Sequence, residues 1–137
     1  EYFQSMDELI QYLQFAYCVK CGSCMSVCPT VATDIEYIGP MPLTQAHRYN
    51  ADTRDDGFAE RKQIVGSEKG AFRCHYAGEC SRVCPKGVDP AKAIQYLKRF
   101  LVMDYLKLFK PKMLSKVVKK AEGKRDHDIP KPPKYTV

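Results

Sequence analysis

The chain has 137 residues, a formal net charge of +6, a hydrophobic content of 45% and seven cysteines. This length suits one small domain with limited room for an apolar core. The sequence contains no run of about 18 apolar residues, so it predicts no membrane-spanning helix, and any membrane contact is expected to be peripheral.

The N-terminal residues 1–6, Glu-Tyr-Phe-Gln-Ser-Met, look like the remnant of an engineered protease-cleavage linker. We therefore expect the folded domain to cover residues 7–110. Its first element is predicted to be a helix over 7–17 with Asp7 as the N-cap, because apolar residues such as Ile10 fall at helical spacing.

A run of four cysteines follows this helix. Residues 18–29 read Cys-Val-Lys-Cys-Gly-Ser-Cys-Met-Ser-Val-Cys-Pro. This C-x-x-C-x-x-C-x-x-x-C-P pattern is typical of bacterial two-cluster ferredoxins, in which the fourth cysteine ligates the other iron–sulfur cluster. The first three cysteines are spaced to lie on one tight loop, and the fourth points away from it.

The segment between the cysteine-rich loops is predicted to be helical with turns. Residues 30–39 are expected to be irregular, and a Gly-Pro pair then introduces a helix over 41–53. After a charged turn, a short helix is expected over 58–65, ended by Gly66. No segment alternates apolar and polar residues with period two, so the predicted fold class is all-α.

A second cysteine run repeats the first run 56 residues later. Residues 74–85 read Cys-His-Tyr-Ala-Gly-Glu-Cys-Ser-Arg-Val-Cys-Pro, so Ala77 stands where the first run has Cys21. Asp89 and Pro90 then form a helix start, as N-cap and first helical residue, and this helix is expected to reach about residue 109.

The two runs together predict two iron–sulfur sites with unequal numbers of ligands. If the last cysteine of each run serves the other run's site, one site receives four thiolates and the other receives three. The four thiolates, which suit a [4Fe-4S] cluster, are Cys18, Cys21, Cys24 and Cys84. Because Ala77 supplies no ligand for a fourth iron, the other site suits a [3Fe-4S] cluster. Its three thiolates are Cys28, Cys74 and Cys80.

Disulfides and zinc are the alternative uses of these cysteines. Seven is an odd number, and no secretory leader pattern precedes the first run, which disfavours a disulfide framework. Zinc usually takes closed sets of four ligands built from paired C-x-x-C units, and a triplet repeat ending in Cys-Pro departs from that pattern.

Positive charge is concentrated toward the C-terminus, where residues 98–125 contain ten lysines and arginines against two acidic residues. Residues 111–137 are expected to form a basic helix over 112–121 followed by a proline-rich tail. A solvated helix face is the plainer interpretation, and docking onto an anchor subunit or anionic lipid is the functional one. Nucleic-acid binding is disfavoured, because the aromatic residues there lie at helix-core spacing.

Cations also stand beside the cysteines, namely Lys20, Arg73, Arg82 and Lys86. We expect them to raise the reduction potentials of bound clusters, because a positive charge stabilises the more negative, reduced state.

From Cys18 to about residue 98, the chain resembles the C-terminal half of the iron–sulfur subunit of succinate dehydrogenase and fumarate reductase. The resemblance rests on the two cysteine runs with a non-cysteine at position 77. It also rests on three further segments: Ile38-Gly39-Pro40, Ala46-His47-Arg48-Tyr49-Asn50, and Pro85-Lys86-Gly87-Val88-Asp89-Pro90.

This resemblance implies an α-helical ferredoxin domain that relays single electrons between a flavoprotein subunit and a membrane quinone. It implies a peripheral position on a membrane-anchor subunit at the cytoplasmic face, and no catalytic site on this chain. Members of the family carry a [2Fe-2S] domain before this one, so we interpret the chain as an excised domain; a naturally short subunit is the alternative.

The resemblance also implies a quinone pocket beside the [3Fe-4S] cluster, drawing on Pro29, His75 and Lys98. His75 also fits a structural imidazole, and Lys98 also fits a basic patch. The chain has no tryptophan after Pro29, whereas ubiquinone-using members typically carry one. Together with the likeness of residues 46–50 to fumarate reductases, this favours menaquinone.

The main alternative to this interpretation is electron transfer in a different enzyme complex. Related helical ferredoxin modules serve heterodisulfide reductases and complexes that oxidise glycerol-3-phosphate or glycolate. Those modules usually carry two complete cysteine runs, so Ala77 disfavours them.

Overall fold

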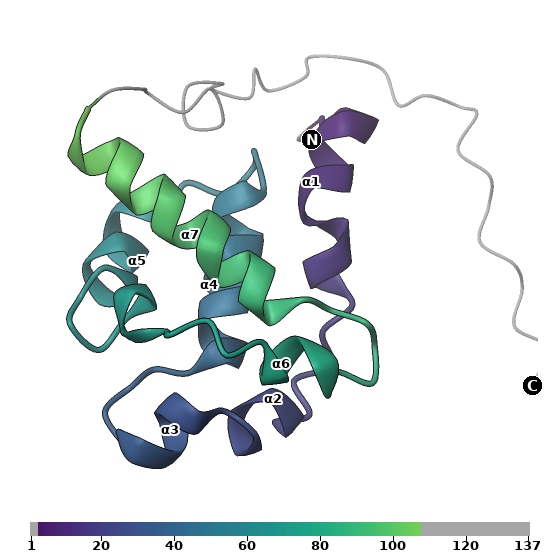
Figure 1. The fold of residues 1–137 in the computed structure, drawn as a ribbon. Coiled ribbons are helices and arrows are strands. Elements are labelled where there is room, and N and C mark those ends of the chain that lie inside the picture. The colour runs from purple at the N-terminus through teal and green to yellow at the C-terminus, as the bar shows by residue number, and fades with distance from the viewer. Residues whose placement is uncertain (1–2, 108–137) are drawn as a thin grey trace, which may run out of the picture.

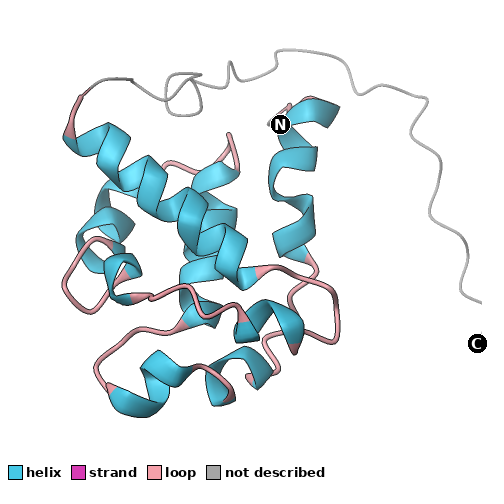
Figure 2. Cartoon of the chain, viewed as in Figure 1, coloured by secondary structure: helices cyan, strands magenta, loops and turns pink. Residues whose placement is uncertain are grey.

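The computed structural model describes residues 3–107, and these form helices and loops without a strand (Figures 1 and 2). The elements are α1 (Met6–Ala16), α2 (Ser23–Ser26), α3 (Pro29–Thr33), α4 (Pro40–Ala51), α5 (Phe58–Val65), the 3-10 helix η1 (Ala71–Arg73), α6 (Glu79–Arg82) and α7 (Pro90–Tyr105). The all-α prediction is confirmed. The helix expected over 112–121 and the proline-rich tail lie outside the described residues.

Helix α4 is the centre of the fold and packs against α7, α1 and α5. The short helices α2, α3 and α6 lie together at one end of the molecule, in the lower part of Figure 1. In the described part of the chain, no helix combines the length and apolar character needed to cross a bilayer.

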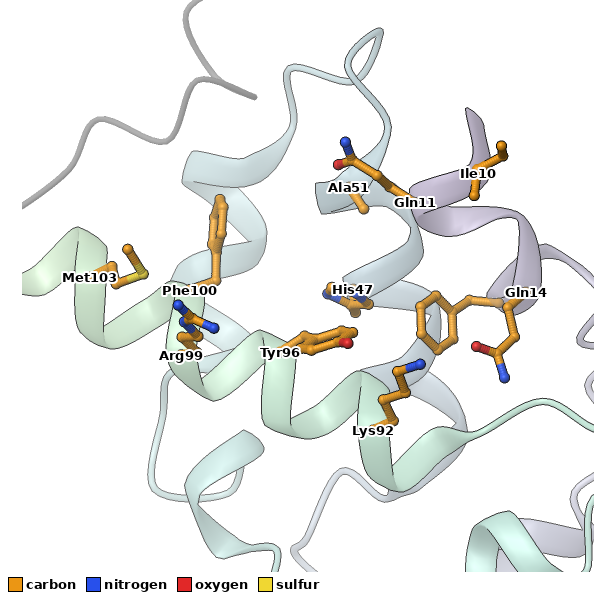
Figure 3. Close-up of a pocket in the computed structure, with 11 residues that line it drawn as sticks. Ile10, Gln11, Gln14, His47, Ala51, Lys92, Tyr96, Arg99, Phe100 and Met103 are labelled. Atoms are coloured by element: carbon orange, nitrogen blue, oxygen red, sulfur yellow. The ribbon is translucent and has the colours of Figure 1, made fainter. Parts of the chain in front are cut away.

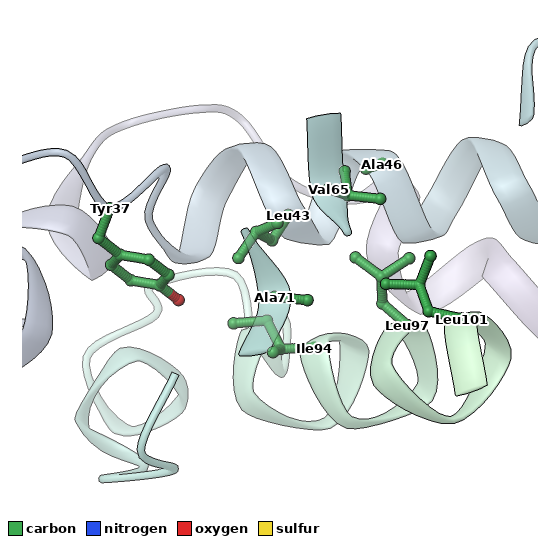
Figure 4. Close-up of a cluster of buried hydrophobic side chains, with 8 residues drawn as sticks. All are labelled: Tyr37, Leu43, Ala46, Val65, Ala71, Ile94, Leu97 and Leu101. Atoms are coloured by element: carbon green, nitrogen blue, oxygen red, sulfur yellow. The ribbon is translucent and has the colours of Figure 1, made fainter. Parts of the chain in front are cut away.

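The core consists of two clusters of buried side chains. The larger contains Tyr37, Leu43, Ala46, Val65, Ala71, Ile94, Leu97 and Leu101 (Figure 4). The smaller contains Phe15, Val88 and Ala93. Cysteines of both runs border each cluster: Cys28 and Cys74 pack against the larger one, and Cys18 and Cys84 against the smaller. The core therefore joins the two cysteine-rich loops.

The first helix begins differently from the sequence prediction. Ser5, not Asp7, is the N-cap, and its hydroxyl accepts a hydrogen bond from the Glu8 backbone N–H while the Glu8 carboxylate accepts one from the Ser5 N–H. This reciprocal capping box provides acceptors for the backbone N–H groups of Ser5 and Glu8 at the start of the helix. The buried face carries Tyr12 and Phe15, whereas Ile10 is exposed.

Other element boundaries differ by a few residues. Residues 30–39 were expected to be irregular, but Pro29 starts the short helix α3, since a proline is pre-organised for the first helical position. Helix α4 ends at Ala51, two residues before the predicted end, and α7 ends at Tyr105 rather than at about 109. Helix α5 and the Asp89 cap of α7 are as predicted.

Candidate metal centres

The two cysteine runs adopt the same backbone conformation. Lys20 and Tyr76 have φ angles of 57° and 60°, and Gly22 and Gly78 have φ angles of 82° and 81°. Each glycine is the N-cap of a four-residue helix, α2 or α6, in a left-handed conformation that strains residues with side chains. The sequence repeat is therefore also a repeat of the backbone.

Cysteines from both runs come together around two small cavities. The cysteines that line one cavity are Cys18, Cys21, Cys24 and Cys84. The cysteines that line the other are Cys28, Cys74 and Cys80. In both cavities, the last cysteine of one run joins cysteines of the other run. This grouping corresponds to the two sets that the spacing predicts.

Ala77 lines the three-cysteine cavity, at the place where a fourth thiol is missing from the sequence. All seven cysteines are free thiols rather than disulfides. Within residues 3–107, no group of three or more cysteine, histidine or acidic side chains is arranged to hold a single metal ion. Cysteine thiolates are the usual ligands of iron–sulfur clusters, so the donor chemistry of both cavities fits such clusters.

Thiols of the two cavities lie near each other. Burial, together with the nearby thiols of Cys18 and Cys80, raises the pKa of Cys24 to about 11. Burial also raises the pKa of Cys80, and Cys74 and Cys28 add to this effect. Because Cys24 and Cys80 line different cavities, the effect of Cys80 on Cys24 means that the two candidate sites are neighbours.

Three groups approach Cys74. The backbone N–H of Tyr76 donates to its Sγ atom at 3.4 Å, and the Lys98 Nζ atom donates to its carbonyl oxygen at 2.7 Å. The hydroxyl of Tyr37 also approaches Cys74, without the geometry of a hydrogen bond to it.

Burial raises the pKa of Tyr37 above its usual range, and the nearby cysteine Cys74 adds to this. Sequence reasoning missed Tyr37 as a site residue, because no spacing or motif sets it apart from a core tyrosine.

Comparison with known proteins identifies the family. The 4Fe-4S dicluster domain family matches residues 14–88, which contain both cysteine runs. The chain belongs to this family. The matched residues contain all seven cysteines and end just before α7.

The domain is similar to iron–sulfur subunits of two enzymes. A fumarate reductase iron–sulfur subunit of Haemophilus influenzae is 43% identical over 110 residues, covering 80% of this chain and 43% of that protein. One of Mycobacterium tuberculosis is 46% identical over 98 residues, covering 72% and 40%. The mitochondrial succinate dehydrogenase [ubiquinone] iron–sulfur subunit of Candida glabrata is 33% identical over 105 residues, covering 76% and 42%. The resemblance stated from the sequence is thus confirmed, and the chain spans about two fifths of the length of these relatives.

The three residues assigned to quinone by resemblance occupy different positions in the dicluster domain. Pro29 lines the three-cysteine cavity. Lys98 contacts the main chain of Cys74, and so lies beside the same cavity. His75 is exposed and is not among the residues that line the cavity. Quinone binding at these residues stays a prediction.

Two of the four cations near the cysteines are paired with carboxylates. Arg73 Nε lies 2.5 Å from Asp34 Oδ2, and Arg82 Nη2 lies 2.5 Å from Glu79 Oε2. These carboxylates offset the positive charge of the two arginines, so their effect on a bound cluster is smaller than the sequence alone indicates. Exposure of the arginines to solvent reduces it further.

A larger groove of about 560 Å³ lies between α1, α4 and α7 of the dicluster domain (Figure 3). Its walls include His47, Phe15, Tyr96 and Phe100, with Lys92 and Arg99 at its edge, and no cysteine. The His47 ring packs edge-on against Phe15, and burial lowers its pKa to about 4. The groove is therefore separate from the two cysteine sites, and His47 is neutral at physiological pH.

Proposed function

We propose that this chain is the cluster-bearing domain of a fumarate reductase or succinate dehydrogenase iron–sulfur subunit, and that it relays single electrons between a flavoprotein subunit and a membrane quinone. The observation that carries the proposal is the pair of neighbouring cysteine-lined cavities, one with four thiols and one with three thiols and Ala77.

The thiols would hold two unlike clusters. Cys18, Cys21, Cys24 and Cys84 are the proposed ligands of a [4Fe-4S] cluster, and Cys28, Cys74 and Cys80 those of a [3Fe-4S] cluster. When bound, such clusters supply reversible one-electron reduction, at potentials set by cluster type, burial and hydrogen bonds to sulfur. The chain's own contribution is to hold the thiols in place, exclude water and keep the two sites adjacent.

The names of the relatives support the wider assembly in which this relay would operate. They are iron–sulfur subunits of fumarate reductase and of succinate dehydrogenase. We propose by analogy a flavoprotein partner and a membrane-anchor partner, a peripheral position at the cytoplasmic face, and menaquinone as the quinone. Pro29 and Lys98, beside the three-cysteine cavity, are the better supported of the proposed quinone contacts. Anionic lipid is a further proposed contact of the basic C-terminal segment.

Low-temperature EPR of anaerobically prepared protein tests the cluster assignment. We expect a [3Fe-4S] signal in the oxidised protein that disappears on reduction, and a [4Fe-4S] signal that appears on reduction. Iron and acid-labile sulfide assays on the same sample check that both clusters are present.

Two results would contradict the proposal. Zinc in place of iron would remove the electron-transfer role. Two four-iron signals would instead favour a helical ferredoxin module of the heterodisulfide reductase or glycerol-3-phosphate type, whose modules usually carry two complete cysteine runs.

A further inference from the structure

The Tyr37 side chain is buried without a hydrogen-bond partner. The residue is 4% exposed, and its hydroxyl oxygen is shielded from solvent while making no hydrogen bond to another described residue. An unpaired buried hydroxyl is destabilising in proteins, and such groups are few in native structures. The position of this hydroxyl therefore calls for a partner that the protein atoms do not provide.

The hydroxyl is next to the three-cysteine site. Tyr37 lines the cavity together with Cys28, Cys74 and Cys80. Its ring lies at one end of the larger core cluster (Figure 4), and Cys28 and Cys74 pack against the same cluster. The ring is thus fixed by core packing, and its one polar atom is on the side of the molecule that carries the thiols.

We propose that the Tyr37 hydroxyl donates a hydrogen bond to sulfur at the three-cysteine site and thereby raises the reduction potential of the cluster bound there. This inference rests on the proposed function, because it requires a cluster at that site. The acceptor is the Cys74 thiolate sulfur or a sulfide of the cluster, both of which accept hydrogen bonds from protein groups.

The direction of the effect follows from charge. Reduction adds one electron, so the cluster and its thiolates become more negative, and a hydrogen bond to sulfur becomes stronger. Tyrosine keeps its proton at neutral pH and can donate in both oxidation states. The hydroxyl therefore stabilises the reduced state more than the oxidised state, which raises the potential.

The two cavities differ in the polar groups that lie near their cysteines. The three-cysteine cavity includes the buried Tyr37 hydroxyl, and Cys74 also receives the Tyr76 N–H and faces Lys98 through its carbonyl oxygen. At the four-cysteine cavity, a short contact of 3.4 Å joins the exposed Cys21 to Ser23. The Tyr37 hydroxyl is buried, whereas the contact between Cys21 and Ser23 is exposed, so the hydroxyl has the larger electrostatic effect on a nearby sulfur.

The test is an EPR-monitored redox titration of the full chain with both clusters assembled, using dithionite as the electron donor and soluble mediators. Tyr37→Phe keeps the ring and removes only the hydroxyl. We expect the equilibrium constant for reduction of the [3Fe-4S] centre to fall by about fivefold to tenfold, where tenfold corresponds to 59 mV for one electron. The midpoint of the [4Fe-4S] centre should stay unchanged.

Tyr12→Phe is the matched control. Tyr12 is also 4% exposed, but its hydroxyl donates to Gln4 and accepts from Arg54. Its removal should leave both midpoints unchanged. As an independent readout, resonance Raman spectra in deuterated water should show an Fe–S stretching shift for the three-iron centre that is smaller in Tyr37→Phe than in the wild type.

Each result separates this inference from the proposed function. A wild-type chain without the three-iron signal would overturn the proposed function and this inference together. Intact signals with an unchanged three-iron midpoint in Tyr37→Phe would overturn this inference alone. Loss of only the three-iron signal in Tyr37→Phe would also overturn it, because the hydroxyl would then act in cluster assembly rather than on the potential.

Discussion

At the scale of single residues, position 77 determines how many thiol ligands the second site offers. Ala77 lines the cavity together with Cys28, Cys74 and Cys80. We predict that Ala77→Cys supplies a fourth thiolate, so that most of the oxidised three-iron EPR signal is replaced by a second four-iron signal on reduction. Ala59→Cys, on the exposed side of α5, adds a thiol away from both cavities and should leave both signals unchanged. A full three-iron signal in Ala77→Cys would show that position 77 does not face the cluster.

His47 is predicted to make the stability of the domain depend on pH. Burial lowers its pKa to about 4 in the folded chain, whereas an unfolded chain has the ordinary value of about 6.5. The unfolded state therefore binds a proton between these pH values that the folded state does not. The unfolding free energy therefore has its full value above about pH 6.5, and the part that depends on His47 is lost as the pH falls toward 4.

We expect the wild type to lose about 2 kcal/mol more unfolding free energy than His47→Gln between pH 7 and pH 5, measured by anaerobic urea unfolding. Thr44→Val is the control, because it changes another buried residue of α4 that does not titrate, and this variant should keep the pH dependence of the wild type. Equal pH profiles for His47→Gln and the wild type would mean that His47 takes up its proton in the folded state.

At the scale of the elements, the start of α1 depends on the capping box of Ser5 and Glu8. We predict that Ser5→Ala lowers the unfolding free energy by about 1 kcal/mol, because the Glu8 N–H loses its acceptor. Asp7→Ala removes only a first-turn charge, and its cost should fall to a few tenths of a kcal/mol at high salt. Urea midpoints measured at high salt distinguish the two variants. A larger loss of unfolding free energy for Asp7→Ala than for Ser5→Ala would indicate that Asp7 is the N-cap.

The helices show which element boundaries could be predicted from sequence. Asp89 with Pro90, and Gly66 after α5, are local signals that act within a few residues, and both hold in the structure. The cap of α1 was assigned wrongly because Ser5 was set aside as part of a linker remnant. The assignment of residues 1–6 to a linker remnant stays a prediction, but Ser5 caps the helix whatever its origin. The short helix α3 was missed because its five residues have no periodicity to detect.

At the scale of the whole molecule, the grouping of the cysteines was predictable and the surroundings of each group were not. Spacing alone assigns Cys28 to the set of the other run, and this cysteine lines the cavity of Cys74 and Cys80. Tyr37 reaches the same cavity from a loop between α3 and α4, which only tertiary packing can determine. Ligand spacing is a property of the local chain, whereas the polar groups around a site come from the whole fold.

The exchange of the last cysteine between the two runs leads to a prediction with opposite outcomes for two matched variants. Cys84 belongs to the second run but lines the cavity of Cys18, Cys21 and Cys24, and Cys28 belongs to the first run but lines the other cavity. Cys84→Ser should therefore remove the reduced four-iron EPR signal and spare the oxidised three-iron signal, and Cys28→Ser should do the reverse. The measured quantity is the ratio of the four-iron to the three-iron signal, and a lower yield of folded protein does not change this ratio. If each run served its own site, Cys84→Ser would remove the three-iron signal instead, and the arrangement of sites proposed for this chain would be wrong.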